Sequence, residues 1–372
     1  MTLPTIPLFA LAGYFLAEGG ASRRLVRVFQ ALAGWFRGGP ALATALVCAF
    51  FTSFTGASGV TILALGGLLM PVLLAARYPE KSSLGLLTAA GSLGLLFPPS
   101  LPVILYGIVA RQPIDRMFLG GFFPGILMLL LTAWWGSRLG QGAAPSRPFD
   151  PREALRAVIA AKWELLLPVV VLVGIYGGFA TLVEAAALTA LYAFVVEAFV
   201  YKDLKAVRDA PRVISQCAVL VGGVLIILGV ALGFTNYLVD AQVPSHAVTW
   251  VKEAIHSPLV FLLLLNLFLL VVGCLMDIFS AIVVVVPLIA PMGAAFGIDP
   301  IHLGIIFLAN MELGYLTPPV GMNLFLASYR FNKPLSEVYR SVVPMLLVLL
   351  AGVLLITYVP ALTTFLPRLL GR

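Results

Sequence analysis

Two stretches with tandem prolines decide the fold: Leu93-Gly-Leu-Leu-Phe-Pro-Pro-Ser100 and Leu313-Gly-Tyr-Leu-Thr-Pro-Pro-Val320. Each stretch lies within a long apolar segment, residues 83 to 110 and residues 302 to 328. Proline removes a backbone hydrogen-bond donor and disfavours helix at the residue before it, so an unbroken helix cannot pass through either pair. We therefore expect two broken helices.

An internal repeat relates the two stretches. Gly94 and Gly314 differ by 220 positions (314 − 94). Each half of the chain reads as helix, surface arm, interrupted hairpin, broken helix, arm and helix. Chance is the alternative explanation, since proline and glycine are frequent in membrane helices. The same offset aligns Pro71 with Pro291, Pro124 with Pro344, and the amphipathic stretch 22 to 36 with the stretch 243 to 257.

The composition of the 372 residues indicates a polytopic helical membrane protein. Apolar residues make up 61% of the chain and charged residues 10%, whereas a soluble domain carries about 25% charged residues. A soluble enzyme is therefore disfavoured. The net charge of +7 comes from basic residues between apolar segments, which is typical of topology signals and predicts no nucleic-acid partner. The cysteines and histidines lack metal-ligand spacing, so we expect no metal site other than one for sodium.

Two further apolar segments are interrupted by short turns. Residues 40 to 76 are interrupted at residues 52 to 59, and residues 258 to 296 turn near residues 273 to 280. Basic residues flank both ends of the first segment, which predicts either two short crossings or one re-entrant hairpin that opens to the cytoplasm. When the basic loops are counted along the chain, the second hairpin opens to the opposite side. The repeats are therefore inverted in topology.

Inverted repeats with discontinuous helices in matching places indicate a secondary transporter whose site lies near the membrane midplane. Irregular backbone at membrane depth is costly unless it lines a cavity or is buried in protein. The turns and breaks offer carbonyl and hydroxyl oxygens to a hard cation such as sodium. The N-termini of the half-helices favour an anionic group.

Four longer motifs carry a family resemblance: Phe51-Thr-Ser-Phe-Thr-Gly-Ala-Ser58, Leu87-Thr-Ala-Ala-Gly-Ser-Leu-Gly-Leu-Leu-Phe-Pro-Pro-Ser100, Asp299-Pro-Ile-His-Leu-Gly304 and Asn310-Met-Glu-Leu-Gly-Tyr-Leu-Thr-Pro-Pro-Val-Gly-Met-Asn-Leu-Phe325. With these motifs the sequence resembles, over nearly the whole chain, the large membrane subunit of tripartite ATP-independent periplasmic (TRAP) transporters.

The resemblance implies an all-α, multi-pass protein of the bacterial cell inner membrane that works by an elevator mechanism. It implies sodium-coupled import of organic acid anions, such as C4-dicarboxylates, sialic acid or other carboxylates. Na+ would be the coupling ion, with no other cofactor and no enzymatic activity. The implied partners are a small membrane subunit, a periplasmic substrate-binding protein and membrane lipid.

Candidate site residues follow from the same resemblance, with each hairpin tip facing a helix break to form a sodium site. Substrate would lie between the two sites, near Ser100 and Asn323. The first sodium site would comprise Ser53, Thr55, Gly56, Ser58, Gly94, Pro98 and Pro99. The second would comprise Asp277, Ser280, Gly314, Thr317, Pro318 and Gly321.

The resemblance also predicts a division into two parts. Residues 40 to 110 and 258 to 328 would form a moving transport domain, each half a hairpin plus a broken helix. The scaffold would comprise residues 1 to 39 as a helix and surface arm, residues 111 to 257 as helices and arms, and residues 329 to 372 as an arm and the last helix.

The chain departs from the family pattern in two places. Many members have Ser-Gly-Ser at the first tip, where this chain has Thr55-Gly56-Ala57 with the serine displaced to Ser58. This puts hydroxyl ligation of sodium there in question. Members also usually have one more helix before the segment that begins at Leu3. We therefore expect this sequence to lack the usual first helix, either because the start codon is misassigned or because the helix has been lost.

Several single residues leave alternatives open. Asp277 is a functional carboxylate at membrane depth, the cap of the helix after the turn, or both. Glu312 either binds a cation or a proton or pairs with backbone amides of the break. Asn310 and Asn323 either satisfy backbone groups freed by the break or contact substrate. The alternative functions are a stand-alone divalent-anion sodium symporter, an intramembrane enzyme that uses Asp277 and Glu312, and a channel.

Overall fold

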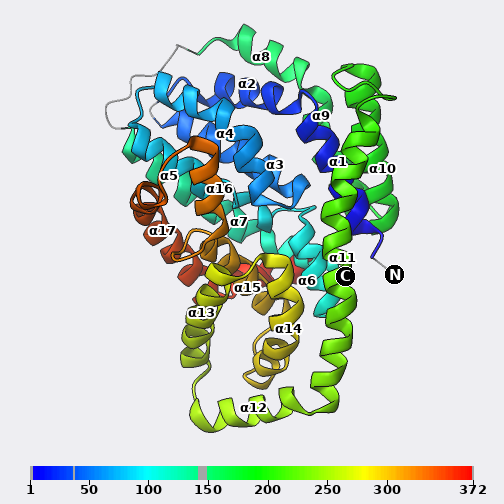
Figure 1. Ribbon diagram of the computed structural model, residues 1–372, viewed down its shortest axis with the longest axis vertical. Helices are drawn as coiled ribbons and strands as arrows, with labels where there is room; N and C mark the ends of the chain where they lie inside the picture. The colour runs from blue at the N-terminus through cyan, green and yellow to red at the C-terminus, as the bar shows by residue number, and fades with distance from the viewer. Residues whose placement is uncertain (1–2, 37, 141–148, 371–372) are drawn as a thin grey trace.

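The computed structural model describes residues 3–36, 38–140 and 149–370, which form helices and connecting turns with no strand (Figure 1). Parts of the expected scaffold segments, residues 1–2, 37, 141–148 and 371–372, therefore lie outside the described residues. The first repeat contains α1 (Thr5–Glu18), α2 (Ala21–Ala33), α3 (Gly39–Thr55), α4 (Ser58–Ala75), α5 (Glu80–Ala90), the short helix η1 (Leu93–Leu96), α6 (Leu101–Val109) and α7 (Ile114–Leu139).

The rest of the chain comprises a connecting region and the second repeat. The connecting region contains α8 (Pro151–Ala160), α9 (Lys162–Tyr176), α10 (Leu182–Val195) and the π-helix η2 (Val196–Val200). The second repeat contains α11 (Ala210–Asp240), α12 (Val243–Ala254), α13 (Pro258–Leu275), α14 (Ile278–Ala295), α15 (Pro300–Gly314), α16 (Met322–Phe331) and α17 (Leu335–Tyr358), and α18 (Ala361–Leu370) follows it.

The offset of 220 residues holds at the level of individual helix ends. Helix α4 spans Ser58–Ala75 and α14 spans Ile278–Ala295, so both ends shift by 220. The residues after these helices also correspond, because Arg77 and Gly297 both adopt the left-handed conformation, with φ of 61° and 70°. The repeat is therefore a structural one, and the chance explanation is wrong.

The two repeats are inverted relative to each other. In Figure 1 the first arm, α2, crosses the upper end of the molecule, and its counterpart α12 crosses the lower end. The hairpins follow their arms, with α3 and α4 towards the upper end and α13 and α14 at the lower end. This is the architecture that the sequence predicts, with a hairpin and a broken helix in each half.

The apolar helices have the lengths that a membrane requires. Among the described residues, seven helices are long and apolar enough to span a bilayer, and two bent helix pairs raise the number to as many as nine. One of the bent pairs is the first predicted break, where residues 80–96 and Leu101–Val109 meet at 46°. The chain is thus a multi-pass membrane protein.

The region between the repeats differs from the sequence analysis. The basic residues between positions 138 and 162 predict a loop between two membrane crossings, but α8 occupies part of it. Asp150 caps α8 by accepting a hydrogen bond from the Arg152 N–H at 2.9 Å. Ala157 and Ala161 of this region pack against Val28 of the first arm. This apolar contact explains why a charged segment is helical here.

Candidate functional site

The first hairpin tip contacts the first helix break. Helix α3 ends at Thr55, Gly56 takes φ of 65°, and α4 begins at Ser58. A Cβ on Gly56 would lie 2.6 Å from the Leu101 side chain at the start of α6. A Cβ on Gly94 would lie 2.6 Å from the Cβ of Thr52 in α3. The tip and the break thus fit together only because both positions lack a side chain.

The hydroxyl groups of this tip are differently engaged. Ser53 Oγ donates to the Phe50 carbonyl at 2.8 Å, and Thr55 Oγ1 donates to the Phe51 carbonyl at 3.0 Å. Ser58 Oγ is buried and has no hydrogen-bond partner among the described residues. Among these hydroxyls, therefore, that of Ser58 is uncommitted, although it is the serine displaced from the family pattern.

The second tip and the second break meet backbone to backbone. A Cβ on Gly314 would lie 2.5 Å from the Cα of Gly273. The Gly321 N–H donates to the Cys274 carbonyl at 3.0 Å, and the Ile278 N–H donates to the hydroxyl of Tyr315 at 2.8 Å. Tyr315 lies directly after α15, and sequence analysis did not find its hydrogen bond to α14.

Asp277 is the cap of α14, one of its two predicted roles. Its Oδ1 accepts hydrogen bonds from the N–H groups of Phe279 at 2.9 Å and Ser280 at 3.0 Å, and its Oδ2 accepts one from the Ser280 hydroxyl. Thr317 Oγ1 donates to the Leu313 carbonyl at 3.0 Å. An oxygen that donates or accepts one hydrogen bond retains a lone pair, so these groups keep some capacity to bind a cation.

The two proline pairs lie between the half-helices. Pro98 and Pro99 occupy the turn between η1 and α6, and Pro318 lies in the turn between α15 and α16. Gly321, immediately before α16, takes φ of 39°, and a Cβ there would lie 2.8 Å from the Thr317 carbonyl oxygen. The backbone conformation at the second break therefore depends on glycine.

Asn323 connects the second half of the molecule to the first. Its Nδ2 donates to the Thr88 carbonyl at 3.3 Å, while its Oδ1 is buried without a hydrogen-bond partner among the described residues. Ser100 Oγ is also buried and has no hydrogen-bond partner among the described residues. Nearby, a Cβ on Gly59 would lie 2.7 Å from Leu326 of α16. Both candidate substrate residues thus present a polar oxygen that the described residues leave unpaired.

Glu312 and Asn310 behave differently from the residues of the break. Glu312 is fully buried, and neither carboxylate oxygen has a hydrogen-bond partner in the described part of the chain, so it does not pair with backbone amides there. Asn310 Nδ2 donates to Asn266 Oδ1 at 2.7 Å and to the Ile306 carbonyl at 2.9 Å. Asn310 therefore joins α15 to α13 and contacts no group of the break in these bonds.

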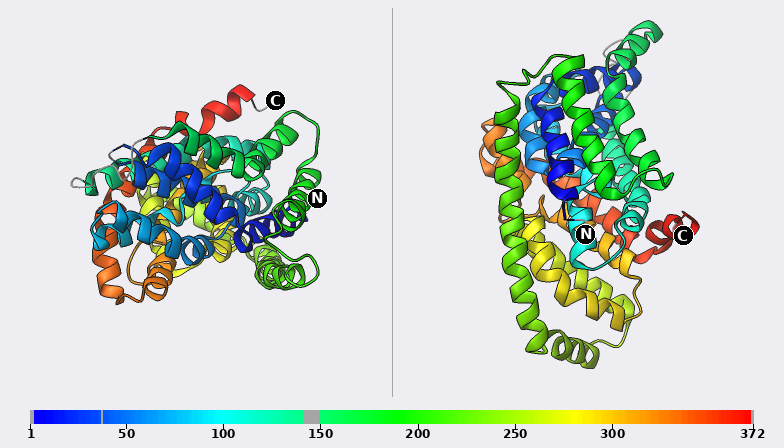
Figure 2. Two further views of the ribbon diagram at one scale, coloured as in Figure 1. Left: turned by 90° about the horizontal axis from the view of Figure 1, so that it is seen from above. Right: turned by 90° about the vertical axis from the view of Figure 1, so that its right-hand side faces the viewer.

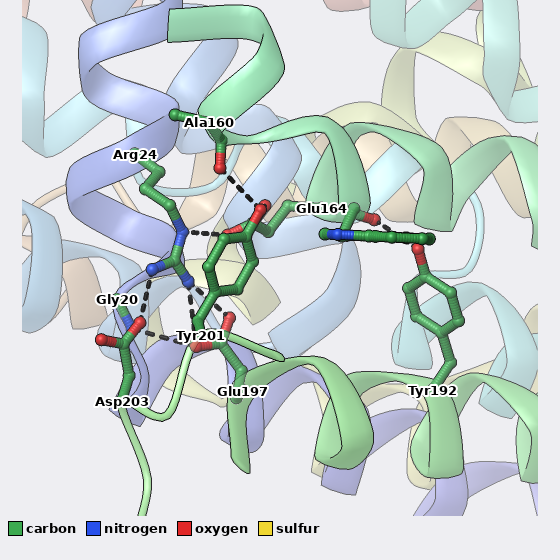
Figure 3. A network of polar contacts seen from close by, with 9 residues as sticks. Gly20, Arg24, Ala160, Glu164, Tyr192, Glu197, Tyr201 and Asp203 are labelled. Carbon is green, nitrogen blue, oxygen red and sulfur yellow. Dashed lines mark hydrogen bonds and ion pairs between the residues drawn. The ribbon is translucent and has the colours of Figure 1, made fainter. Parts of the chain in front are cut away.

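A buried ionic cluster holds the first arm to the connecting region (Figure 3). The Arg24 guanidinium forms ion pairs with Glu164, Glu197 and Asp203, and it lies 3.6 Å from the centre of the Tyr201 ring. The Glu164 and Glu197 side chains are fully buried. Burial alone would lower the pKa of Arg24, but the hydrogen bonds that its guanidinium donates to Asp203 and Glu164 raise it above its ordinary value. The arginine therefore remains charged.

Two glycines allow this cluster to form. Gly19 and Gly20 separate α1 from α2, and the Gly20 N–H donates to the Glu197 carboxylate at 3.2 Å. A side chain on Gly19 would collide with Glu197, and one on Gly20 would collide with Asp203. No local sequence pattern identifies this role of the glycine pair, because its partners lie far away in the chain.

The fold and the paired tips and breaks define a class. A multi-pass membrane protein with inverted repeats, each with a hairpin against a broken helix, is a secondary transporter in its architecture. Residues 1–362 match the family model "Tripartite ATP-independent periplasmic transporter, DctM component". The chain belongs to this family, the large permease subunits of TRAP transporters, and it is a transport protein rather than an enzyme.

Curated relatives and a solved structure agree with this assignment. The chain is 37% identical to the C4-dicarboxylate TRAP transporter large permease protein DctM of Pseudomonas aeruginosa, over 100% of this chain and 87% of the relative. It is 35% identical to the isethionate TRAP transporter permease protein DctMQ of Oleidesulfovibrio alaskensis, covering 97% of this chain and 57% of the relative. It is 31% identical to the ectoine/5-hydroxyectoine permease UehC of Ruegeria pomeroyi, covering 98% and 86%.

The fold is similar to that of a crystallised transporter. The YdaH transporter of Alcanivorax borkumensis, described as having an unusual topology, superposes with a TM-score of 0.66 at 17% sequence identity. The match covers 96% of this chain and 84% of that chain. At this identity the similarity concerns the fold alone.

Proposed function

We propose that this chain is the transport subunit of a sodium-coupled importer of small organic acid anions in the bacterial inner membrane. A small membrane subunit and a periplasmic substrate-binding protein would complete the system. Membership of the family supports this proposal. The isethionate relative supports it as well, because its name, permease protein DctMQ, joins the large permease subunit to a second component in one protein. C4-dicarboxylates are the first class of solute to test, because DctM relatives named for them are 36% and 37% identical to this chain.

The matched contacts between tips and breaks are the observation that carries the proposal. Residues 40 to 110 and 258 to 328 would move together as the transport domain, against a scaffold of the remaining helices. Contacts across the repeats support this grouping, because α4 packs against α16 and α14 packs against α6. The Asn323 to Thr88 hydrogen bond joins the same two halves.

Sodium would bind where each tip meets its break. At the first tip, Ser58 offers a hydroxyl that no described residue occupies, and the turn and break supply backbone carbonyls. At the second tip, Asp277 adds negative charge and Thr317 adds a hydroxyl oxygen. Oxygen ligands of this kind suit a hard cation. The other residues predicted for the two sodium sites form the turns and breaks themselves.

The substrate anion would lie between these sites, near Ser100 and Asn323. Helix α6 begins directly after Ser100, and α16 begins one residue before Asn323. Helix N-termini present free N–H groups and a partial positive charge, which favours a carboxylate. Two bound cations would add to this attraction, so anion and sodium would bind cooperatively.

Reconstitution of the separate components tests this proposal. The chain, the small subunit and the binding protein are incorporated into or added to proteoliposomes, singly and together, and uptake of labelled C4-dicarboxylate is measured. We expect uptake only with all three proteins. Uptake by this chain alone would instead establish a stand-alone symporter.

A further inference from the structure

The first helices of the two repeats, α1 and α11, differ in how they contact their hairpins. In α1, a Cβ on Gly13 would lie 2.7 Å from the carbonyl carbon of Phe54 and 2.8 Å from the Cα of Thr55. Gly13 therefore packs directly against the backbone at the first hairpin tip. The same close approach would be impossible for a residue with a side chain unless the backbone moved.

The repeat offset assigns a counterpart to each of these residues. Adding 220 takes Gly13 to Gly233 in α11, Phe54 to Cys274 and Thr55 to Leu275. A Cβ on Gly233 would meet nothing within 4 Å in the described part of the structure. The second tip therefore does not rest on α11 at the position where the first tip rests on α1.

The packing of whole helices shows the same asymmetry. Helix α1 packs against its hairpin helix α3 and against α6, as well as against α10 and α11, whereas α11 packs against α1, α12 and α14. Along one edge of the molecule, α11 runs down to the second arm, α12 (Figure 1, Figure 2). The two inverted halves thus have corresponding elements in different arrangements.

We propose that Gly233 is the docking position of the second hairpin tip in the state that faces the other side of the membrane. In that state α11 packs at Gly233 against Cys274 and Leu275, as α1 packs here at Gly13 against the first tip, and the first tip leaves Gly13. Exchanging the arrangements of two inverted halves produces a state of opposite access. This inference rests on the proposed transport function.

Four glycines of α11, at positions 222, 223, 229 and 233, have open space where a Cβ would lie, and the repeat offset singles out Gly233 among them. Glycine in a helix interior costs about 1 kcal/mol relative to alanine, and at Gly13 the close backbone contact accounts for that cost. At Gly233 open space surrounds the position, so a larger residue would fit here. The need for a small residue arises when the second tip docks.

A cross-linking experiment tests the contact without reference to transport. The full chain, with its partner subunits in membranes, carries Cys48→Ala and Cys217→Ala, and Gly233→Cys is paired with native Cys274. A disulfide requires a Cα separation of about 4.4–6.8 Å. Gly223→Cys is the matched control, because it is equally open in α11 and lies about 15 Å from Gly233 along the helix.

We expect mild oxidation to consume both free thiols of the Gly233→Cys protein, measured by a polyethylene glycol maleimide shift, and to leave those of the control free. Equal labelling of the two proteins after oxidation would overturn the inference. This readout does not depend on uptake, so it is separate from a failure of the proposed function.

A bulky variant provides a second test. Gly233→Trp fits the described state, so we expect normal yield and thermal unfolding, but loss of uptake because the second tip cannot dock. Gly223→Trp should retain uptake. A Gly233→Trp protein that transports as well as wild type would contradict the docking contact. Absence of uptake by the wild-type protein would count against the proposed function, and the cross-link would still decide the inference.

Discussion

Gly273 and Gly314 meet where the second hairpin crosses the second helix break, so close that a Cβ on Gly314 would lie 2.5 Å from the Cα of Gly273. The corresponding position of the first half, Gly94, packs against α3 in the same way, because a Cβ there would collide with the Ala49 carbonyl oxygen and the Ser53 backbone nitrogen. The contact between tip and break is thus repeated in both halves and is made of backbone.

Gly314→Ala should disrupt the second tip. The added methyl group forces the backbones of α13 and α15 apart, and overpacking of this kind costs about 1–3 kcal/mol. We expect a lower thermal unfolding temperature and loss of sodium-dependent uptake. Gly229→Ala is the control, because that position is open and alanine favours helix by about 1 kcal/mol. Equal behaviour of the two variants would show that the contact is unimportant.

Ser58→Ala and Thr317→Ala should weaken sodium binding. Loss of one oxygen ligand is expected to cost about 1.4 kcal/mol, so the half-saturating sodium concentration for uptake should rise about tenfold. Thr189→Ala is a matched control, because Thr189 Oγ1 also donates to the carbonyl four residues earlier, that of Ala185, but lies in α10. Wild-type sodium dependence in both site variants would remove these residues from the cation sites.

Asn323→Asp should weaken binding of an anionic substrate. A second negative charge about 4 Å from a carboxylate is repelled by about 4 kcal/mol at an effective dielectric constant of about 20, so KM should rise at least about tenfold. Asn332→Asp introduces the same charge at the exposed end of the same helix and should leave KM unchanged. An unaltered KM for Asn323→Asp, in protein of normal yield, would place the substrate elsewhere.

Arg24→Ala should destabilise the fold far more than Arg27→Ala. Removal of Arg24 leaves the buried carboxylates of Glu164 and Glu197 without their counter-ion, which costs about 3–5 kcal/mol. Arg27 pairs with Glu153 at 2.8 Å, but both side chains are exposed, so its loss should cost no more than about 1 kcal/mol. Thermal unfolding of the purified proteins in detergent measures the difference, and equal effects would show that the cluster is dispensable.

The repeat and its broken helices could be predicted because each signal is local. Proline pairs, glycines and apolar runs act on the backbone within a few residues, and the offset of 220 then carries one half onto the other. Helix α8 was not predicted, because the apolar contact of Ala157 and Ala161 with Val28 joins segments far apart in the sequence.

The polar interior was largely beyond sequence analysis for the same reason. Asn310 pairs with Asn266 across 44 residues, and Arg24 pairs with Glu164 across 140 residues. No spacing rule connects such partners, which meet only after the helices pack. The capping of α14 by Asp277 was one of two predicted roles, because a cap acts over two or three residues.

The most direct test of sodium coupling is uptake of labelled C4-dicarboxylate into proteoliposomes that contain the complete system, with an inward sodium gradient and no other ion gradient. We expect accumulation above the external concentration, and rapid loss of the accumulated solute when a sodium ionophore collapses the gradient. Accumulation that is equal with and without the sodium gradient would contradict the central proposal.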